Sequence, residues 1–255
     1  FPPIYAEKGC IIMEIKKVWK IFFSATGTTE KIVRTVADCL AASCGVEVTE
    51  YDFTLPPERE GFPSLTATDL VVFGCPTYAG RLPNLLLNYL NTITGGGAYA
   101  IPIVTFGNRA FDNSLAELCS LLEAHEFHTI AAAAFSCEHC FSTTLGGGRP
   151  DENDLKDAEN FALSVFGKMV KSVAFCQPIN PVEVDGDPNA AYYQPRDRHG
   201  ASIDIRKVKP VTTKACTQCG FCAEVCPMGA IDKNDCTRTP GICIKCCACI
   251  KKCPQ

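Results

Sequence analysis

Cysteine spacing is the most informative chemical pattern in this sequence. Near its end the chain reads C-T-Q-C-G-F-C-A-E-V-C-P and then, after a short spacer, C-I-K-C-C-A-C-I-K-K-C-P. In each run two residues separate the first three thiols from one another, three residues separate the third from the fourth, and proline follows the fourth. This is the spacing that holds 4Fe–4S clusters, so the sequence predicts two such clusters.

The two runs also predict how the thiols are shared. Three closely spaced thiolates wrap one cube, and the fourth is carried away to ligate the other. We therefore expect the first cluster on Cys216, Cys219, Cys222 and Cys253, and the second on Cys243, Cys246, Cys249 and Cys226. Two zinc knuckles or a disulfide knot are the alternatives, but a zinc site usually needs only two pairs of ligands with a longer gap between them.

Length and composition set the class of protein. The chain has 255 residues, enough for one domain of usual size plus a small module. The spacing of the two runs uses eight of the 18 cysteines, and the other ten fit no disulfide framework. Pro2, Pro3, Glu7 and Lys8 interrupt any secretory signal, and no apolar run is long enough to span a membrane. These features predict a cytoplasmic protein with reduced thiols, typical of an anaerobe.

Charge is unevenly distributed along the chain. From residue 206 onward there are nine Lys and Arg against three Asp and Glu, a net charge of +6. The preceding residues carry fifteen basic and twenty-five acidic side chains, a net charge of −10. A basic tail is one signature of nucleic-acid binding, but no aromatic residues interleave these charges. We therefore expect no nucleic-acid partner.

Apolar runs alternate with helical patterns before the cysteine runs. Strands are expected over residues 18–23, 46–51, 70–74, 101–106 and 129–135. Helices are expected between residues 29 and 45 and over 82–93, 113–126 and 155–173. This alternation predicts a doubly wound five-stranded parallel sheet covered on both faces. In the strand order 2-1-3-4-5, ligands bind at the carboxyl ends of the strands, where the order reverses between the first and third.

Three loops at that edge carry candidate binding residues. The first, after the first strand, offers hydroxyls, a glycine and a helix N-terminus without the lysine of a nucleotide loop, which suits a monophosphate. An ordinary helix cap is the alternative. In the second loop, Tyr78 is placed to stack on an aromatic ligand. The candidates are Ser24, Ala25, Thr26, Gly27, Thr28 and Thr29, then Pro76, Thr77, Tyr78, Ala79 and Gly80, then Phe106, Gly107, Asn108, Arg109, Phe111 and Asp112.

Together these stretches resemble the flavodoxin–ferredoxin fusion proteins. The stretches F-S-A-T-G-T-T-E, G-C-P-T-Y-A-G-R-L-P and T-F-G-N-R-A-F-D-N carry the likeness to flavodoxins, and the cysteine runs carry the likeness to two-cluster bacterial ferredoxins. The resemblance implies a flavodoxin-like domain over residues 18–175 and a small α+β ferredoxin domain over 206–255. It also implies noncovalent FMN, with its phosphate at 24–29 and its ring between 75–81 and 106–112. In flavodoxins the third loop usually adds an aromatic, for which Phe111 is the candidate here.

The remaining segments are an N-terminal extension, a proline-rich arm and a loop with two thiols. Residues 1–17 precede the first strand, and 176–205 form an arm too apolar to be a free linker. The loop contains Cys137 and Cys140, which form either a redox pair or ordinary packing. His139 in that loop and Arg109 are the candidates for catalysis.

Two functions from these parts compete. The first is a carrier that shuttles single electrons between two 4Fe–4S clusters and FMN, with a ferredoxin-type partner. The second is an FMN-dependent reductase of a small acceptor, such as a quinone or nitro compound, fed by the ferredoxin domain. A third hypothesis is a flavin-binding sensor or interaction module whose cysteines hold zinc. Direct oxidation of NAD(P)H is not expected, because no G-x-G-x-x-G fingerprint is present. The oligomeric state stays open.

Overall fold

A computed structural model describes residues 13–255, apart from the side chain of Arg206. Its centre is a parallel sheet built from β1 (Lys17–Phe22), β2 (Glu47–Asp52), β3 (Asp69–Pro76), β4 (Tyr99–Phe106), β5 (His128–Thr129) and β6 (Ala133–Ser136). The strands lie in the order β2-β1-β3-β4-β5, and β6 also pairs with β4. This confirms the predicted order 2-1-3-4-5, which is that of flavodoxin-like folds. The proposed extension before residue 13 lies outside the described residues.

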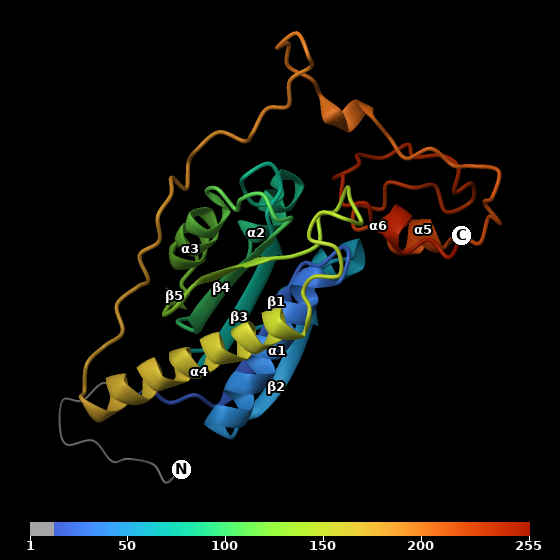
Figure 1. The fold of residues 1–255 in the computed structure, drawn as a ribbon. Helices are drawn as coiled ribbons and strands as arrows, with labels where there is room; N and C mark the ends of the chain where they lie inside the picture. Colours follow the sequence, from blue (N-terminus) through green and yellow to red (C-terminus); the bar gives the residue numbers. More distant parts are fainter. Residues whose placement is uncertain (1–12) are drawn as a thin grey trace.

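Helices cover both faces of the sheet (Figure 1). On one face, α1 (Thr28–Cys44) and α4 (Glu152–Ala174) lie side by side over a core that includes Val18, Phe22 and Val33. On the other face, α2 (Leu87–Leu90) and α3 (Ser114–Ala124) cover Phe73 and its neighbours. Both faces of β3 are therefore buried, as the continuous apolar run of a central parallel strand predicts.

Two predicted elements differ from the structure. The expected fifth strand is divided into β5 and β6, which both pair with β4. The shift in residue number between paired residues grows by one from the Tyr99–His128 pair to the Ile103–Ala133 pair. One extra residue in the edge strand is a β-bulge, which interrupts the pairing. The helix expected over residues 82–93 shortens to a 3₁₀ turn, η2 (Asn84–Leu86), followed by α2.

The arm packs along the sheet domain. The backbone N–H of Val182 donates to Thr129 O (2.9 Å), and the Tyr192 hydroxyl donates to Leu82 O (2.8 Å). After the arm come a short turn, η3 (Ile205–Lys207), and two single-turn helices, α5 (Phe221–Glu224) and α6 (Ala248–Lys251). A further 3₁₀ turn, η1 (Pro56–Glu60), follows β2. Within residues 13–255, no helix combines the length and apolar character that crossing a membrane requires.

A buried ion pair ties three segments together. Arg81 follows β3, Glu117 lies on α3, and their side chains form two hydrogen bonds of 2.8 and 2.6 Å. Glu117 also accepts from the N–H of Leu82 (2.7 Å), and Arg81 donates to Pro188 O in the arm (2.7 Å). The two side chains are only 10% and 7% exposed, so each charge depends on the other for compensation.

We expect Glu117→Ala to destabilise the protein, because the Arg81 charge is then buried without its partner. The free energy of unfolding should fall by about 3 kcal/mol. Urea denaturation followed by fluorescence of Trp19, the single tryptophan, measures it. The matched control is Glu159→Ala on the exposed side of α4, which should change the value by less than about 0.5 kcal/mol. Equal stability of the two variants would contradict the role given to this pair.

Candidate functional site

The loops that follow β1, β3 and β4 meet at one edge of the sheet. All three strands run parallel, so their carboxyl ends, Phe22, Pro76 and Phe106, lie at the same edge. The tail after residue 205, drawn in orange to red in Figure 1, lies beside this edge and against the loop over residues 137–150. Three cavities are found here, two at the loops and one inside the tail.

The first cavity opens at the start of α1. It has a volume of about 290 Å³, and Thr26, Gly27 and Thr28 line it. Gly27 caps the helix with a φ of 90°, a left-handed conformation that glycine adopts without strain. In the described part of the chain neither Thr26 nor Thr28 has a hydrogen-bond partner for its hydroxyl. Free hydroxyls at a helix N-terminus form a donor set that fits a phosphate.

Other residues of the first loop have structural partners. Ser24 is buried, and its Oγ accepts from the N–H of Glu30 (3.0 Å). Thr29 is also buried and shares a 2.7 Å hydrogen bond with the Thr105 hydroxyl on β4. Ala25 belongs to the apolar core. The structure therefore brings Thr26, Gly27 and Thr28 to the cavity and uses the flanking residues to hold the loop.

Charged side chains also line this cavity, a feature that the sequence did not predict. Lys31 comes from α1, Glu138 and Arg149 from the loop after β6, and Lys251 from the tail. Lys31 Nζ donates to Pro150 O (2.8 Å), and Arg149 Nε donates to Asp154 Oδ2 (2.9 Å). Hydrogen bonds from Lys251 and from the N–H of Gly148 hold the pKa of Glu138 below its usual value. The hydroxyls, glycine and helix N-terminus expected from the first loop are therefore joined by charged side chains from other segments.

The second cavity, of about 580 Å³, lies between the second and third loops, the arm and the tail. Of the predicted ring-binding residues, Thr77, Tyr78, Ala79, Gly80, Phe106, Gly107 and Arg109 line it. Pro76, Asn108, Phe111 and Asp112 are not among its lining residues. Phe111 packs on Phe106 instead, with ring centroids 5.5 Å apart, and Asn108 accepts from the Ser136 hydroxyl (3.0 Å).

Tyr78 lies on the side of this cavity that faces the tail. Burial, reinforced by the nearby thiols of Cys246 and Cys140, raises its pKa well above the usual value. The side chain is therefore a neutral phenol at physiological pH and cannot act as a base. It offers an aromatic surface, which fits the stacking role predicted for it.

The catalytic candidates also reach the second cavity. A Cβ on Gly107 would lie 2.6 Å from Cδ2 of His139, so glycine is required there for the loop to approach. Arg109 pairs with Asp112 and lies over the ring of Tyr193, 5.7 Å from its centroid. The arm closes this side, because the N–H of Tyr193 donates to Ala79 O (2.9 Å). Sequence reasoning missed Tyr192 and Tyr193 as lining residues, although it marked the arm that carries them as too apolar for a free linker.

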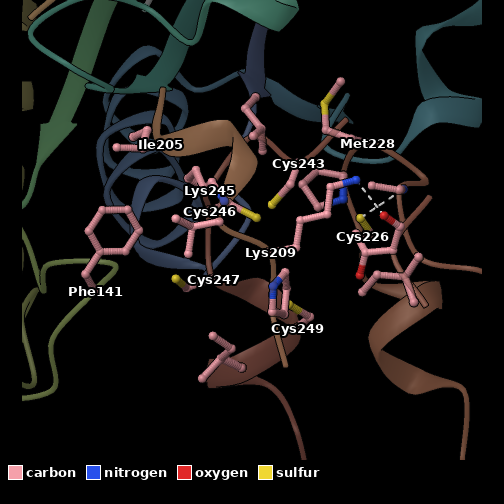
Figure 2. Close-up of a pocket in the computed structure, with 18 residues that line it drawn as sticks. Phe141, Ile205, Lys209, Cys226, Met228, Cys243, Lys245, Cys246, Cys247 and Cys249 are labelled. Atoms are coloured by element: carbon pink, nitrogen blue, oxygen red, sulfur yellow. Dashed lines mark hydrogen bonds between the residues drawn. The ribbon is translucent and has the colours of Figure 1, made fainter. Parts of the chain in front are cut away.

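The third cavity, of about 350 Å³, lies within the tail (Figure 2). The four thiols assigned to the second cluster all line it: Cys226, Cys243, Cys246 and Cys249. The remaining lining is mainly apolar and includes Met228 and Ile231. Within residues 13–255, no three His, Cys, Asp or Glu side chains are spaced to hold one metal ion. Four thiols that line one apolar cavity are a donor set that fits a 4Fe–4S cluster.

The two cysteine runs have the same backbone conformation. Gln218 and Lys245, at matching positions, both have positive φ, at 56° and 65°. At the next matching pair, Gly220 caps α5 and Cys247 caps α6, with φ values of 79° and 58°. Positive φ is uncommon for a non-glycine residue, so its recurrence shows that the runs fold alike.

The thiols assigned to the first cluster are more accessible. Cys219 and Cys253 are exposed, whereas Cys216 and Cys222 are half-buried. Cys236, which belongs to neither run, lies close enough to Cys216 to interact with it. Backbone N–H groups donate to one sulfur of each set, from Gln218 to Cys216 and from Ala230 to Cys226, both at 3.3 Å.

Cys137 and Cys140 occupy different surroundings. Cys137 is buried in the core beneath α1 and α4, whereas Cys140 contacts the tail, its thiol donating to Lys245 O at 3.8 Å. Burial raises the pKa of Cys137 to about 12 and that of Cys140 to about 11. Both are therefore protonated thiols at neutral pH, which favours packing over a reactive pair.

Comparison with known proteins finds a family match for part of the tail. Residues 210–232 match the family described as 4Fe-4S binding domain. No curated protein matches the chain.

Solved structures that are similar to the chain include an archaeal flavodoxin, with 10% identity and a TM-score of 0.43, covering 60% of this chain and 99% of its own. Oxidised flavodoxin 2 from Bacillus cereus has 16% identity and a TM-score of 0.44, covering 60% and 98%. Rubredoxin oxygen:oxidoreductase from Desulfovibrio gigas has 15% identity and a TM-score of 0.44, covering 64% and 38%. The fold assignment does not depend on these likenesses but on the strand order. By that order and by the 4Fe–4S match, the chain joins a flavodoxin-like domain to a ferredoxin-type region.

Proposed function

We propose that this protein shuttles single electrons between two 4Fe–4S clusters and FMN, and exchanges them with a redox protein partner. One observation carries the proposal: the second and third cavities share a wall. Five residues line both of them, namely Phe141, Ile205, Cys243, Ile244 and Lys245. One of the five, Cys243, is a proposed cluster ligand. A flavin ring in one cavity and a cluster in the other would thus be separated by a single layer of residues.

The proposal of two clusters is supported by the likeness of the two runs. The 4Fe–4S match covers the first run only. The second run has the same cysteine spacing, the same positive-φ positions and a matching short helix. Four of the eight proposed ligands also line one cavity. A chain that folds two such runs alike is expected to use both for the same purpose.

FMN is assigned to the first two cavities by their lining. Thr26, Gly27 and Thr28 would hold its phosphate, and Tyr78 would stack on its ring. When bound, FMN exchanges one or two electrons and a 4Fe–4S cluster exchanges one. The residues of this chain orient both groups and restrict solvent, since the arm and the tail close over the second cavity.

The proposed partner site lies at the exposed thiols. Cys219 and Cys253, both assigned to the first cluster, are exposed. Phe221, which lies between two thiols of the first run, is 39% exposed. Cys246 of the second set is only 7% exposed. The first cluster would therefore meet the partner, and the second would face the flavin.

A second candidate function is reduction of a small acceptor over the flavin. The observation that favours it is that a cation and an imidazole line the cavity assigned to the flavin ring. Arg109, with 63% of its side chain exposed, and His139 are available there to position an acceptor.

Cysteine replacements should remove the clusters one at a time. The wild type, purified without oxygen, should hold about eight irons and eight sulfides per chain. Cys219→Ser and Cys243→Ser should each lose about half, because each removes a ligand of a different cluster. Iron and sulfide analysis with the absorption spectrum measures this. Cys236→Ser is the control and should retain all the iron; if it loses iron while Cys219→Ser does not, the ligand assignment is wrong.

Turnover assays separate the carrier from the reductase. With a reduced ferredoxin as donor, a carrier should reduce quinone and nitro acceptors no faster than the same concentration of free FMN. Arg109→Ala should leave that rate unchanged. Saturable turnover above free FMN that falls roughly tenfold or more in Arg109→Ala would support the reductase instead.

A further inference from the structure

One cation of the tail reaches the cavity at the start of α1. Lys251 is the last residue of α6, and its side chain is 17% exposed. Its Nζ pairs with Glu138 Oε1 and donates to His139 O (2.8 Å) and Ser142 O (3.0 Å). All three N–H bonds of the ammonium group therefore go to the loop that follows β6.

Glu138 connects this contact to the cavity lining. The carboxylate oxygen that does not face Lys251 accepts from the N–H of Gly148 (2.9 Å). Glu138, Gly148 and Lys251 all line the cavity beside Thr26 and Gly27. Because its pKa is lowered, Glu138 is a charged carboxylate at neutral pH.

A carboxylate in the wall is unfavourable for a phosphate. Two anions in one small cavity repel each other unless a cation compensates one of them. Two other cations line the cavity, but Arg149 already pairs with Asp154. Lys31, the other of the two, donates to Pro150 O. Lys251 is the cation that pairs with Glu138.

We propose that Lys251 is a positioning residue for the FMN phosphate, acting by neutralising Glu138 across the boundary between sheet and tail. The inference rests on the FMN site proposed above. It makes flavin affinity depend on the docked tail, and by reciprocity the bound flavin favours the docked tail. Lys251 lies between Cys249 and Cys253, proposed ligands of different clusters, so one turn of chain would serve the flavin and both clusters.

The experiment compares two flavins on cluster-loaded protein from which flavin has been removed without oxygen. Quenching of flavin fluorescence gives the Kd of FMN and of riboflavin, which lacks the phosphate. Lys251→Met should weaken FMN binding roughly tenfold and change riboflavin binding by less than about twofold. The matched control is Lys252→Met, next in sequence and exposed, which should bind both flavins as the wild type does.

Two further variants show whether Lys251→Met acts on FMN binding through charge or through a change in structure. Lys251→Met with Glu138→Gln should recover most of the lost FMN affinity, because the uncompensated carboxylate is then absent. Glu138→Gln alone keeps the ammonium group and should bind FMN at least as tightly as the wild type. The inference would be overturned if the single and the double variant that carry Glu138→Gln both lost FMN affinity. It would also be overturned if Lys251→Met lost affinity for FMN and riboflavin equally.

Remaining outcomes are also decisive. If the wild type binds FMN and Lys251→Met binds it equally well, the inference fails and the proposed function stands. If the wild type binds neither flavin, the proposed function fails and the inference fails with it. Should Lys251→Met not fold, Lys251→Arg and Glu138→Gln are used: the first should keep FMN affinity within about threefold of the wild type and the second should not lower it. A loss of FMN affinity in either would overturn the inference.

Discussion

Burial of the second cysteine run against the sheet domain is the contact on which the rest of the arrangement depends. Ile244, Cys246 and Ala248 belong to the same apolar cluster as Phe73 and Leu86, and are 8%, 7% and 0% exposed. Apolar burial of this kind is non-directional, so it holds the tail in place without setting its register. Register comes from directional contacts, of which the Lys251–Glu138 ion pair and the donation from Arg59 to Pro227 O are examples.

This contact makes the two cysteine runs unequal although they fold alike. The second run lies against the sheet, and three of its proposed ligand thiols line an apolar cavity together with Cys226. The thiols assigned to the first cluster include two exposed ones, Cys219 and Cys253. Cluster potentials depend on solvent exposure and on hydrogen bonds to sulfur. Two runs of identical spacing therefore acquire different surroundings from docking alone. If both hold clusters as proposed, their potentials would differ without any difference in ligands.

Local sequence patterns were enough to predict much of this fold. Contacts between residues that are distant in the sequence could not be predicted from such patterns. The central strands and the long helices were correct because their apolar periodicity depends on near neighbours. The bulge between β5 and β6 was missed because register is decided by the partner strand, and the short α2 was missed because tertiary packing overrides propensity. The same limit applies to the site. Thr26 and Tyr78 follow strands and could be found, whereas Lys251 and Glu138 are 113 residues apart and meet only in the folded chain.

The cross-boundary contacts also give a physical reason for joining the two parts in one chain. Separate proteins would have to find each other at each exchange, whereas a tether makes the encounter intramolecular. The arm does more than tether, because Tyr192 and Tyr193 line the second cavity and their hydrogen bonds fix the arm beside the loop after β3. The buried Arg81–Glu117 pair extends that restraint to α3 and, through Pro188, back to the arm. The sheet, the arm and the tail thus all hold the wall shared by the second and third cavities. The fold therefore sets the separation of the two cavities, whereas between separate proteins each encounter would have to set it anew.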